Sequence, residues 1–109
     1  MNTDLEKILW SLVTNIATNS NCKKRNVGCI IYHTGLQDVV GQGWNIHLDD
    51  KCDCATTKTG QHAEVTAIHD MMGPYKREDL IAFVDHQPCF ACGTALETVV
   101  KEVRYRSQK

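Results

Sequence analysis

The sequence predicts a single α/β domain in which helices cover both faces of a mixed sheet, giving three layers, α/β/α. Stretches with helical periodicity alternate with short β-branched runs, in the order helix, strand, strand, helix, strand, helix, strand. Strands that alternate with helices tend to pair in parallel, as we expect for the later part of the sheet. A chain of 109 residues can bury one modest core but not two, so residues 1–109 are expected to form one domain.

The first half of the chain begins with a predicted helix over residues 3–19. Thr3-x-x-Glu6 is a capping box at its start. The apolar residues that follow recur at helical spacing and define one buried face: Leu5, Ile8, Leu9, Leu12 and Ile16. Two β-branched runs, 27–32 and 39–44, are separated by a short turn and predict a hairpin.

The second half begins with a polar segment, residues 45–60, which predicts a loop near the site, because loops of this length are usually functional. A helix is expected to begin close to Gln61 and to end at Gly73. A continuous apolar strand, a third helix and a last short strand follow, at residues 80–84, 90–100 and 103–105. Ligand sites in such folds lie beyond the carboxyl ends of strands, where loops lead into helices.

The net charge and the lack of a signal or membrane-spanning segment in the sequence narrow the class of protein. The net charge is −1, from 12 basic and 13 acidic residues, which does not favour nucleic acid as a partner. The N-terminus lacks the basic start and apolar core of a secretory signal, and no apolar run approaches the roughly 20 residues that span a bilayer. We therefore expect a reduced, cytoplasmic protein (host cell cytoplasm if viral) with no membrane partner.

Two short motifs carry the chemistry: His62 and Glu64 in the first, and Cys89 and Cys92 after Pro88 in the second. One imidazole and two thiolates leave a tetrahedral zinc with an open position, which distinguishes a catalytic zinc site from a structural one. The two cysteines are three residues apart at a helix start, where both can face one point and partial positive charge favours the thiolate. Zinc held by His62, Cys89 and Cys92 matches the pattern of zinc nucleobase deaminases.

Glu64 is the expected proton carrier of a hydrolytic deamination. It follows His62 by two residues, so its carboxylate can reach water at the metal without being a ligand, and zinc lowers the pKa of such water towards roughly 7. Glu64 would take a proton from this water, deliver it to the ring nitrogen beside the amino-bearing carbon, and help to protonate the departing ammonia. The alternative is a closed structural site in which Glu64 is a bystander and the fourth ligand is His33, His47, His86 or a cysteine.

These motifs make the chain resemble the cytidine deaminase superfamily over nearly its whole length, and within it the deoxycytidylate (dCMP) deaminases most. The similarity is carried by residues 20–28, by Gly43-Trp44-Asn45 and by residues 85–89. Deaminases of free nucleosides usually have cysteine where His62 stands. Polynucleotide cytidine deaminases usually have a Ser-Trp-Ser-Pro-Cys stretch, which residues 85–89 do not match. The resemblance implies a three-layer cytidine-deaminase-like fold and a nucleotide substrate.

The resemblance also implies which residues contact the substrate. Asn45 matches an asparagine that bonds the sugar, with an ordinary turn asparagine as the alternative. Arg25, with a neighbouring lysine such as Lys24, is the candidate for the 5′-phosphate, because an arginine fork pairs bidentately with phosphate. A solvated basic loop is the alternative there. His86 matches a histidine that could approach base or phosphate or be held by backbone bonds, and Ala63 completes the expected contacts.

A second, structural zinc is a further candidate, with ligands from Cys22, His47, Cys52 and Cys54. Loop cysteines without metal are the alternative. Thr66 stands where the family often has asparagine. The chain ends where the family normally adds another helix and strand, so we expect a short C-terminus. The sheet edge that this exposes favours a homo-oligomer.

The sequence therefore predicts a zinc-dependent hydrolase of cyclic amidines that converts dCMP to dUMP and ammonia, a step in dTMP precursor supply. The runner-up is a deaminase of tRNA adenosine, of single-stranded nucleic acid or of another free nucleobase or nucleoside. A non-catalytic zinc module is the third candidate. Glu64 counts against it, because a module without chemistry has no need of a proton carrier.

Overall fold

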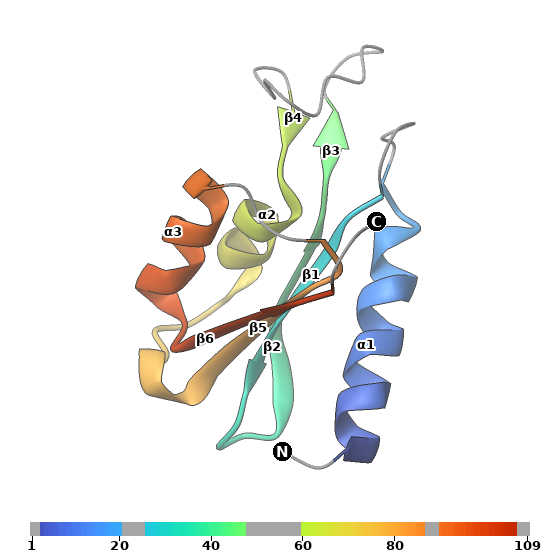
Figure 1. Cartoon of the computed structure of the whole chain (residues 1–109). Helices are drawn as coiled ribbons and strands as arrows, with labels where there is room; N and C mark the ends of the chain where they lie inside the picture. The colour runs from blue at the N-terminus through green and yellow to red at the C-terminus, as the bar shows by residue number, and fades with distance from the viewer. Residues whose placement is uncertain (1–2, 21–25, 48–59, 87–89, 107–109) are drawn as a thin grey trace.

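The computed structural model describes residues 3–20, 26–47, 60–86 and 90–106 of the chain (Figure 1). In chain order its elements are α1 (Thr3–Ala17), β1 (Gly28–His33), β2 (Asp38–Trp44), β3 (Ile46–His47), β4 (Gly60–Gln61), α2 (Ala63–Asp70), the 3-10 turn η1 (Arg77–Asp79), β5 (Leu80–Val84), α3 (Phe90–Val99) and β6 (Glu102–Tyr105). Among the described helices, none is both long and apolar enough to cross a membrane.

The main sheet has four strands in the order β2-β1-β5-β6. β1 pairs antiparallel with both β2 and β5, whereas β6 pairs parallel with β5. α1 lies on one face of this sheet, and α2 and α3 pack together on the other (Figure 1). The predicted three-layer α/β/α arrangement, with a mixed sheet that is parallel in its later part, is confirmed.

The core has two apolar layers, one on each face of the sheet. The layer beneath α2 and α3 contains Val27, Cys29, Ile31, Ala63, Ala67, Leu80, Ala82, Val84, Leu96 and Val100. The layer beneath α1 contains Leu9, Val13, Ile16, Ile30, Tyr32, Ile81 and Phe83. Trp10 packs against this second layer, with its ring edge-to-face with Phe83 at a centroid distance of 5.2 Å. Successive residues of β5 enter opposite layers, so all of them are buried and the sequence of β5 is a continuous apolar run.

Gly43 in β2 allows α2 to approach the sheet closely. A Cβ at this position would lie 2.5 Å from the backbone nitrogen of Ala67 and 2.7 Å from the carbonyl oxygen of Ala63. The backbone of α2 therefore rests directly on β2, at a distance that no residue with a side chain would permit without a shift. This contact sets the height above the sheet of the helix that carries Glu64.

α2 ends at Asp70, so the prediction that it extends to Gly73 is wrong. Met71 already has extended backbone angles (φ −67°, ψ 130°). The carboxylate of Asp70 accepts the N–H of Gln42 in β2 at 3.1 Å. A tertiary contact with the neighbouring strand thus lies at the point where the helix stops, and a local pattern cannot reveal such a contact.

The polar segment 45–60 is not a loop throughout, which corrects the prediction for its two ends. Ile46 and His47 form β3, which pairs antiparallel with Gly60 and Gln61 of β4. Glycine is a poor strand former, and the two paired dipeptides are far apart in the chain. Local propensity therefore gives little sign of this pairing.

Candidate active site

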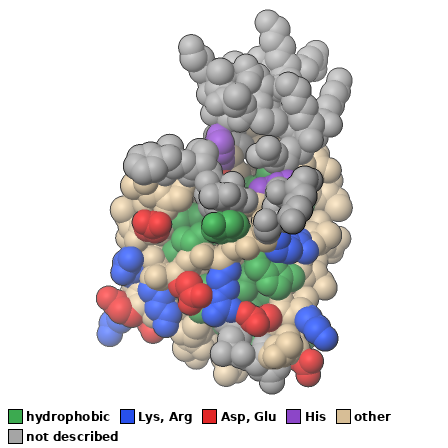
Figure 2. Space-filling model, viewed as in Figure 1, with side chains coloured by type: hydrophobic (Ala, Val, Ile, Leu, Met, Phe, Trp, Pro, Cys, Tyr) green, Lys and Arg blue, Asp and Glu red, His purple; other side chains and the backbone are tan. Residues whose placement is uncertain are grey.

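His62 and Glu64 of the first predicted zinc motif, and Cys92 of the second, lie where helices begin, at one end of the molecule (Figure 1). α2 follows β4, and α3 follows the turn after β5 (Figure 1). In the same view, Figure 2 shows histidine side chains towards this end of the molecule. His62 immediately precedes α2, and Cys92 is the third residue of α3. Because α2 and α3 pack against each other, the two motifs start from neighbouring helices.

His62 is held by its backbone. Its main chain is extended (φ −78°, ψ 151°), and its carbonyl oxygen accepts both the N–H of Thr66 at 3.1 Å and the Thr66 hydroxyl at 2.9 Å. The half-buried imidazole does not cap α2, whose first turn is part of the described chain. Thr66 therefore bonds the His62 carbonyl through its hydroxyl as well as its N–H, a contact that the sequence motifs did not reveal.

Glu64 is almost fully buried in the first turn of α2, with 3% of its surface exposed. Burial raises the pKa of this carboxyl above its ordinary value, because the charged form loses its hydration. A backbone hydrogen bond and the neighbouring His62 act in the opposite direction, whereas the carboxylate of Asp85 raises the pKa further. A carboxyl whose pKa is raised by burial is typical of general acid–base groups in enzymes.

Asn45 lies between β2 and β3 and bonds the residue that precedes β1. Its Oδ1 accepts the N–H of Val27 at 2.9 Å, and its own N–H donates to the Val27 carbonyl at 3.2 Å. The bond fixes the plane of the amide and directs its oxygen towards Val27. Asn45 therefore has a structural role at this turn, and its contact with a sugar remains a prediction.

Asp85, directly after β5, is a buried carboxyl that the sequence motifs did not identify as a site residue. Only 8% of it is exposed, and its Oδ1 accepts the N–H of Gly28 at 2.9 Å. Burial raises its pKa, while the bond from Gly28 and the nearby His86 and Arg106 lower it. The available signal in the sequence is an acidic residue at the end of a continuous apolar strand.

Replacing Asp85 with asparagine is expected to change how stability depends on pH. The folded protein holds the Asp85 proton more tightly than the unfolded chain does, so this group stabilises the fold most at low pH. Its contribution is lost as pH rises through the folded-state pKa. The melting temperature of Asp85→Asn relative to the wild type should therefore rise between about pH 4 and about pH 7.5, measured by circular dichroism. A constant difference would contradict this expectation.

Several predicted site residues lie outside the described part of the chain: Cys22, Lys24, Arg25, Cys52, Cys54 and Cys89. His47 in β3 and Cys92 in α3 are placed by their backbone, but their side chains are not described. Ala63 is fully buried in the first turn of α2, and His86 is half-buried directly after Asp85. The second zinc site and the phosphate contact remain predictions.

Of the expected zinc ligands, the structure describes the half-buried imidazole of His62 and the backbone of Cys92. Cys92 lies in the first turn of α3, where partial positive charge favours a thiolate, so its position suits a zinc ligand. Within the described ranges, no three histidine, cysteine or acidic side chains form a metal-binding group. None is expected there, because Cys89 and the side chain of Cys92 fall outside those ranges.

Comparison with models of known protein families identifies the family of the chain. Residues 3–106 match the model of the cytidine and deoxycytidylate deaminase zinc-binding region. The chain belongs to this family. The resemblance to the cytidine deaminase superfamily, inferred from His62, Glu64 and the two cysteines, is thereby confirmed.

Solved structures of this family's fold are similar to the chain. The dCMP deaminase of cyanophage S-TIM5 in apo form superimposes with a TM-score of 0.81 at 25% identity, covering 98% of this chain and 86% of that one. The same cyanophage enzyme in complex with dCMP and dUMP gives 0.82 at 24% identity, covering 100% and 85%. RibD from Acinetobacter baumannii gives 0.70 at 21% identity, covering 95% and 28%. A search of curated protein sequences finds no match.

Proposed function

We propose that the chain is a zinc-dependent hydrolase that converts dCMP to dUMP and ammonia. The observation that carries the proposal is the buried Glu64, with its raised pKa, two residues after His62 at the start of α2. Membership of the deaminase family supports the reaction class. The cyanophage dCMP deaminase of similar fold is solved in complex with dCMP and dUMP, which supports these nucleotides as substrate and product.

His62, Cys89 and Cys92 would hold the zinc. When bound, zinc lowers the pKa of water towards roughly 7 and so supplies a nucleophile at neutral pH. A second, structural zinc would use ligands from Cys22, His47, Cys52 and Cys54. Elemental analysis decides between these readings, because the purified protein should contain one zinc per chain without the second site and two with it.

Glu64 moves the protons of the reaction. Its carboxylate accepts a proton from the attacking water as the water oxygen bonds to C4 of the base, and the carboxyl delivers that proton to N3. Glu64 then takes the remaining proton from the hydroxyl on C4 and delivers it to the amino group. The bond between C4 and the amino nitrogen then breaks, its electron pair leaves with ammonia, and the oxygen on C4 becomes the carbonyl of uracil. The burial of Glu64 keeps bulk water away from these transfers.

The remaining proposed contacts orient dCMP for this step. The Nδ2 group of Asn45 would donate to a sugar hydroxyl, because its Oδ1 is directed towards Val27. Arg25, with Lys24 beside it, would bind the 5′-phosphate through a bidentate pair. Ala63 and His86 lie next to Glu64 and Asp85 in the chain and would border the base.

Arg25→Ala is expected to weaken the use of dCMP about tenfold or more in kcat/KM, while the use of deoxycytidine changes less than about twofold. The reason is that only dCMP carries the phosphate that the guanidinium would bind. Steady-state ultraviolet assays on both substrates measure this. Arg77→Ala is the matched control, because Arg77 is exposed and its Nε donates to the Glu97 carbonyl, away from the site. Equal losses on both substrates would remove Arg25 from the phosphate role.

The substrate itself is tested by one ultraviolet assay on protein of measured zinc content. The panel contains dCMP, deoxycytidine, dCTP, cytidine monophosphate, a single-stranded oligonucleotide and an adenosine-containing tRNA stem–loop. We expect dCMP to react fastest. On the face seen in Figure 2, acidic and basic side chains are interspersed, and no basic stripe suited to RNA stands out among the described residues there. Turnover of the oligonucleotide or the stem–loop alone would overturn the dCMP assignment.

We further infer a cytoplasmic homo-oligomer. β6 is the last strand on one side of the described sheet, and an edge of this kind favours pairing with a second copy. Light scattering coupled to size-exclusion chromatography measures the mass in solution. A monomer at all accessible concentrations would contradict the oligomer.

A further inference from the structure

Val27 and Gly28, at the start of β1, each exchange two hydrogen bonds with one residue of another segment. The side-chain oxygen of Asn45 accepts the N–H of Val27 at 2.9 Å, and the N–H of Asn45 donates to the Val27 carbonyl at 3.2 Å. In the same way, Oδ1 of Asp85 accepts the N–H of Gly28 at 2.9 Å, and the N–H of Asp85 donates to the Gly28 carbonyl at 3.2 Å. We call these two pairs the strand clamps.

The strand clamps join the ends of three strands. Asn45 directly follows β2 and Asp85 directly follows β5, while Gly28 begins β1, the strand between them, and Val27 directly precedes it. In an extended chain, the N–H groups of successive residues point to opposite sides. The two clamps therefore approach β1 from its two neighbouring strands, and a shift of Gly28 would be passed through one peptide unit to Val27 and its partner.

Gly28 has little freedom to move once Asp85 holds it. A Cβ at this position would collide with the carbonyl oxygen of Val13 and would lie 3.0 Å from the backbone nitrogen of Ala17. The start of β1 is thus pressed against α1 on one face. Without the Asp85 bond, the Gly28 N–H would be a buried donor in need of a new partner, so the local backbone would have to move.

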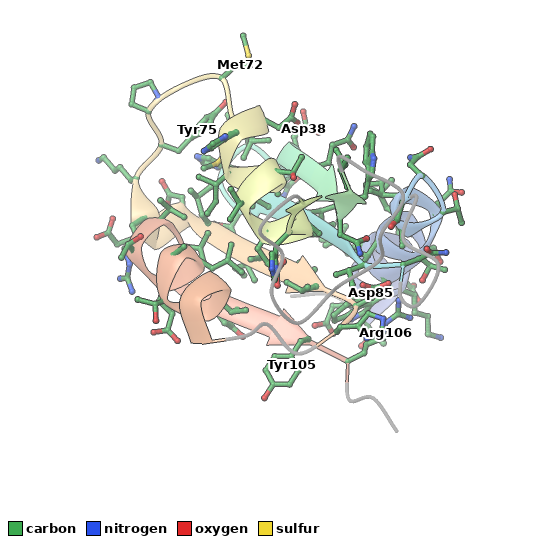
Figure 3. The ribbon with its side chains drawn as sticks, turned by 90° about the horizontal axis from the view of Figure 1, so that it is seen from above. Asp38, Met72, Tyr75, Asp85, Tyr105 and Arg106 are labelled. Atoms are coloured by element: carbon green, nitrogen blue, oxygen red, sulfur yellow. The ribbon has the colours of Figure 1, made fainter. Side chains whose placement is uncertain are left out.

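Arg106 lies close enough to Asp85 to lower the pKa of its carboxyl (Figure 3). The N–H of Arg106 donates to the carbonyl of Val84 at 3.3 Å, which puts Arg106 beside Asp85 at the end of the sheet (Figure 3). Its guanidinium lies 4.9 Å above the ring centre of Trp10 and donates to the Thr14 hydroxyl at 2.7 Å. A fixed cation next to a buried carboxylate lowers the free-energy cost of keeping the charge there.

We propose that Asp85 is a positioning residue for substrate binding: by holding Gly28 it fixes Val27, and through Val27 the amide of Asn45. This proposal rests on the proposed function only in the assignment of Asn45 to the sugar of dCMP. A contact made with the sugar exists both before and during the reaction. Its misplacement therefore raises KM and leaves kcat nearly unchanged.

The kinetic test compares Asp85→Ala, Asp85→Asn, Asn45→Ala and the double variant Asn45→Ala/Asp85→Ala on dCMP. Asp85→Ala should raise KM about tenfold with kcat within about twofold, since small displacements of a positioning group are costly. Asp85→Asn should recover most of this loss, because it keeps an oxygen for the Gly28 N–H. In the Asn45→Ala background, Asp85→Ala should change KM less than about twofold. Asp38→Ala is the matched control, because Asp38 also accepts a backbone N–H, that of Val39, but it pairs with His33 at the opposite end of β1 from Gly28.

A second measurement tests the clamps without any substrate. Amide hydrogen exchange of Val27 and Gly28, followed by NMR, should speed up about tenfold or more in Asp85→Ala and stay unchanged in Asp38→Ala. If wild-type protein does not use dCMP, the proposed function fails, and the exchange of Val27 still decides the coupling between the clamps. If Asp85→Ala does not fold, Asp85→Ser takes its place in both measurements.

Three results would each overturn the proposal. The first is an equal effect of Asp85→Ala on KM with and without Asn45, because the residue would then act through something else. The second is a loss in Asp85→Asn as large as in Asp85→Ala, which would point to the charge and not to the hydrogen bond. The third is unchanged exchange of the Val27 N–H in Asp85→Ala, because a shift of Gly28 would then not reach Val27.

Discussion

Glu64→Ala is expected to lower kcat for deamination by at least ~10²-fold while the protein keeps its zinc and its fold. The loss follows from removing the carboxyl that would carry the proton from water to the base. The structure adds a second expectation about stability. Burial disfavours the charged form of Glu64, so removing this group should leave the melting temperature unchanged or higher. Steady-state kinetics, zinc analysis and thermal unfolding of one preparation measure all three quantities.

A loss of turnover without a loss of stability would identify Glu64 as a residue of the reaction and not of the fold. Glu64→Gln is the isosteric companion, since it keeps the volume of the side chain but cannot carry the proton. Glu78→Ala, at an exposed position in η1, is the control for losing a carboxylate elsewhere and should change neither kcat nor the melting temperature appreciably. Unchanged turnover in Glu64→Ala would contradict the mechanism. Lost zinc or lost folding would make Glu64 a structural residue instead.

Much of the fold could be predicted because its elements carry strong local periodicity. α1 shows helical spacing behind a capping box, and β5 is a continuous apolar run, since residues of β5 enter both core layers. The hairpin of β1 and β2 was visible as two β-branched runs around a turn. In each case the sequence signal arises from burial of the element's own side chains, which is a local property of the pattern.

Features that depend on distant contacts could not be predicted. The end of α2 coincides with a bond between Asp70 and Gln42, and the pairing of β3 with β4 joins two dipeptides with little strand propensity. The importance of Asp85 has the same origin. Its carboxyl matters because Gly28, far away in the chain, offers an N–H at 2.9 Å. No window around Asp85 contains that information.

The residues of the candidate site also fall into two groups, those that a local motif predicts and those that it does not. His62, Glu64 and the cysteine motif could be identified because metal chemistry demands particular residue types at a particular spacing. The residues that hold them in place could not, because backbone positioning can be done by many residue types. Thr66 bonds the His62 carbonyl through its hydroxyl, a role for which the usual family asparagine was no guide.

Gly43→Ala is expected to reduce kcat/KM by up to ~10²-fold and the free energy of unfolding by about 1–3 kcal/mol. The added Cβ would meet the backbone of α2, at 2.5 Å from the nitrogen of Ala67 and 2.7 Å from the oxygen of Ala63. Since neither contact is with a flexible side chain, the helix itself must move. α2 carries Glu64 and follows His62 directly, so the displacement reaches the proposed proton carrier and a proposed metal ligand together.

Gly73→Ala is the matched control for the Gly43 experiment, because a Cβ there would lie 3.8 Å from the nearest atom, a ring carbon of Tyr75, which is ordinary contact. It should leave both kinetics and stability nearly unchanged. A destabilised but fully active Gly43→Ala would contradict the link between the height of α2 and catalysis. A displaced helix would instead lower activity even at temperatures where the variant is fully folded, because His62 and Glu64 would both shift relative to the neighbouring α3.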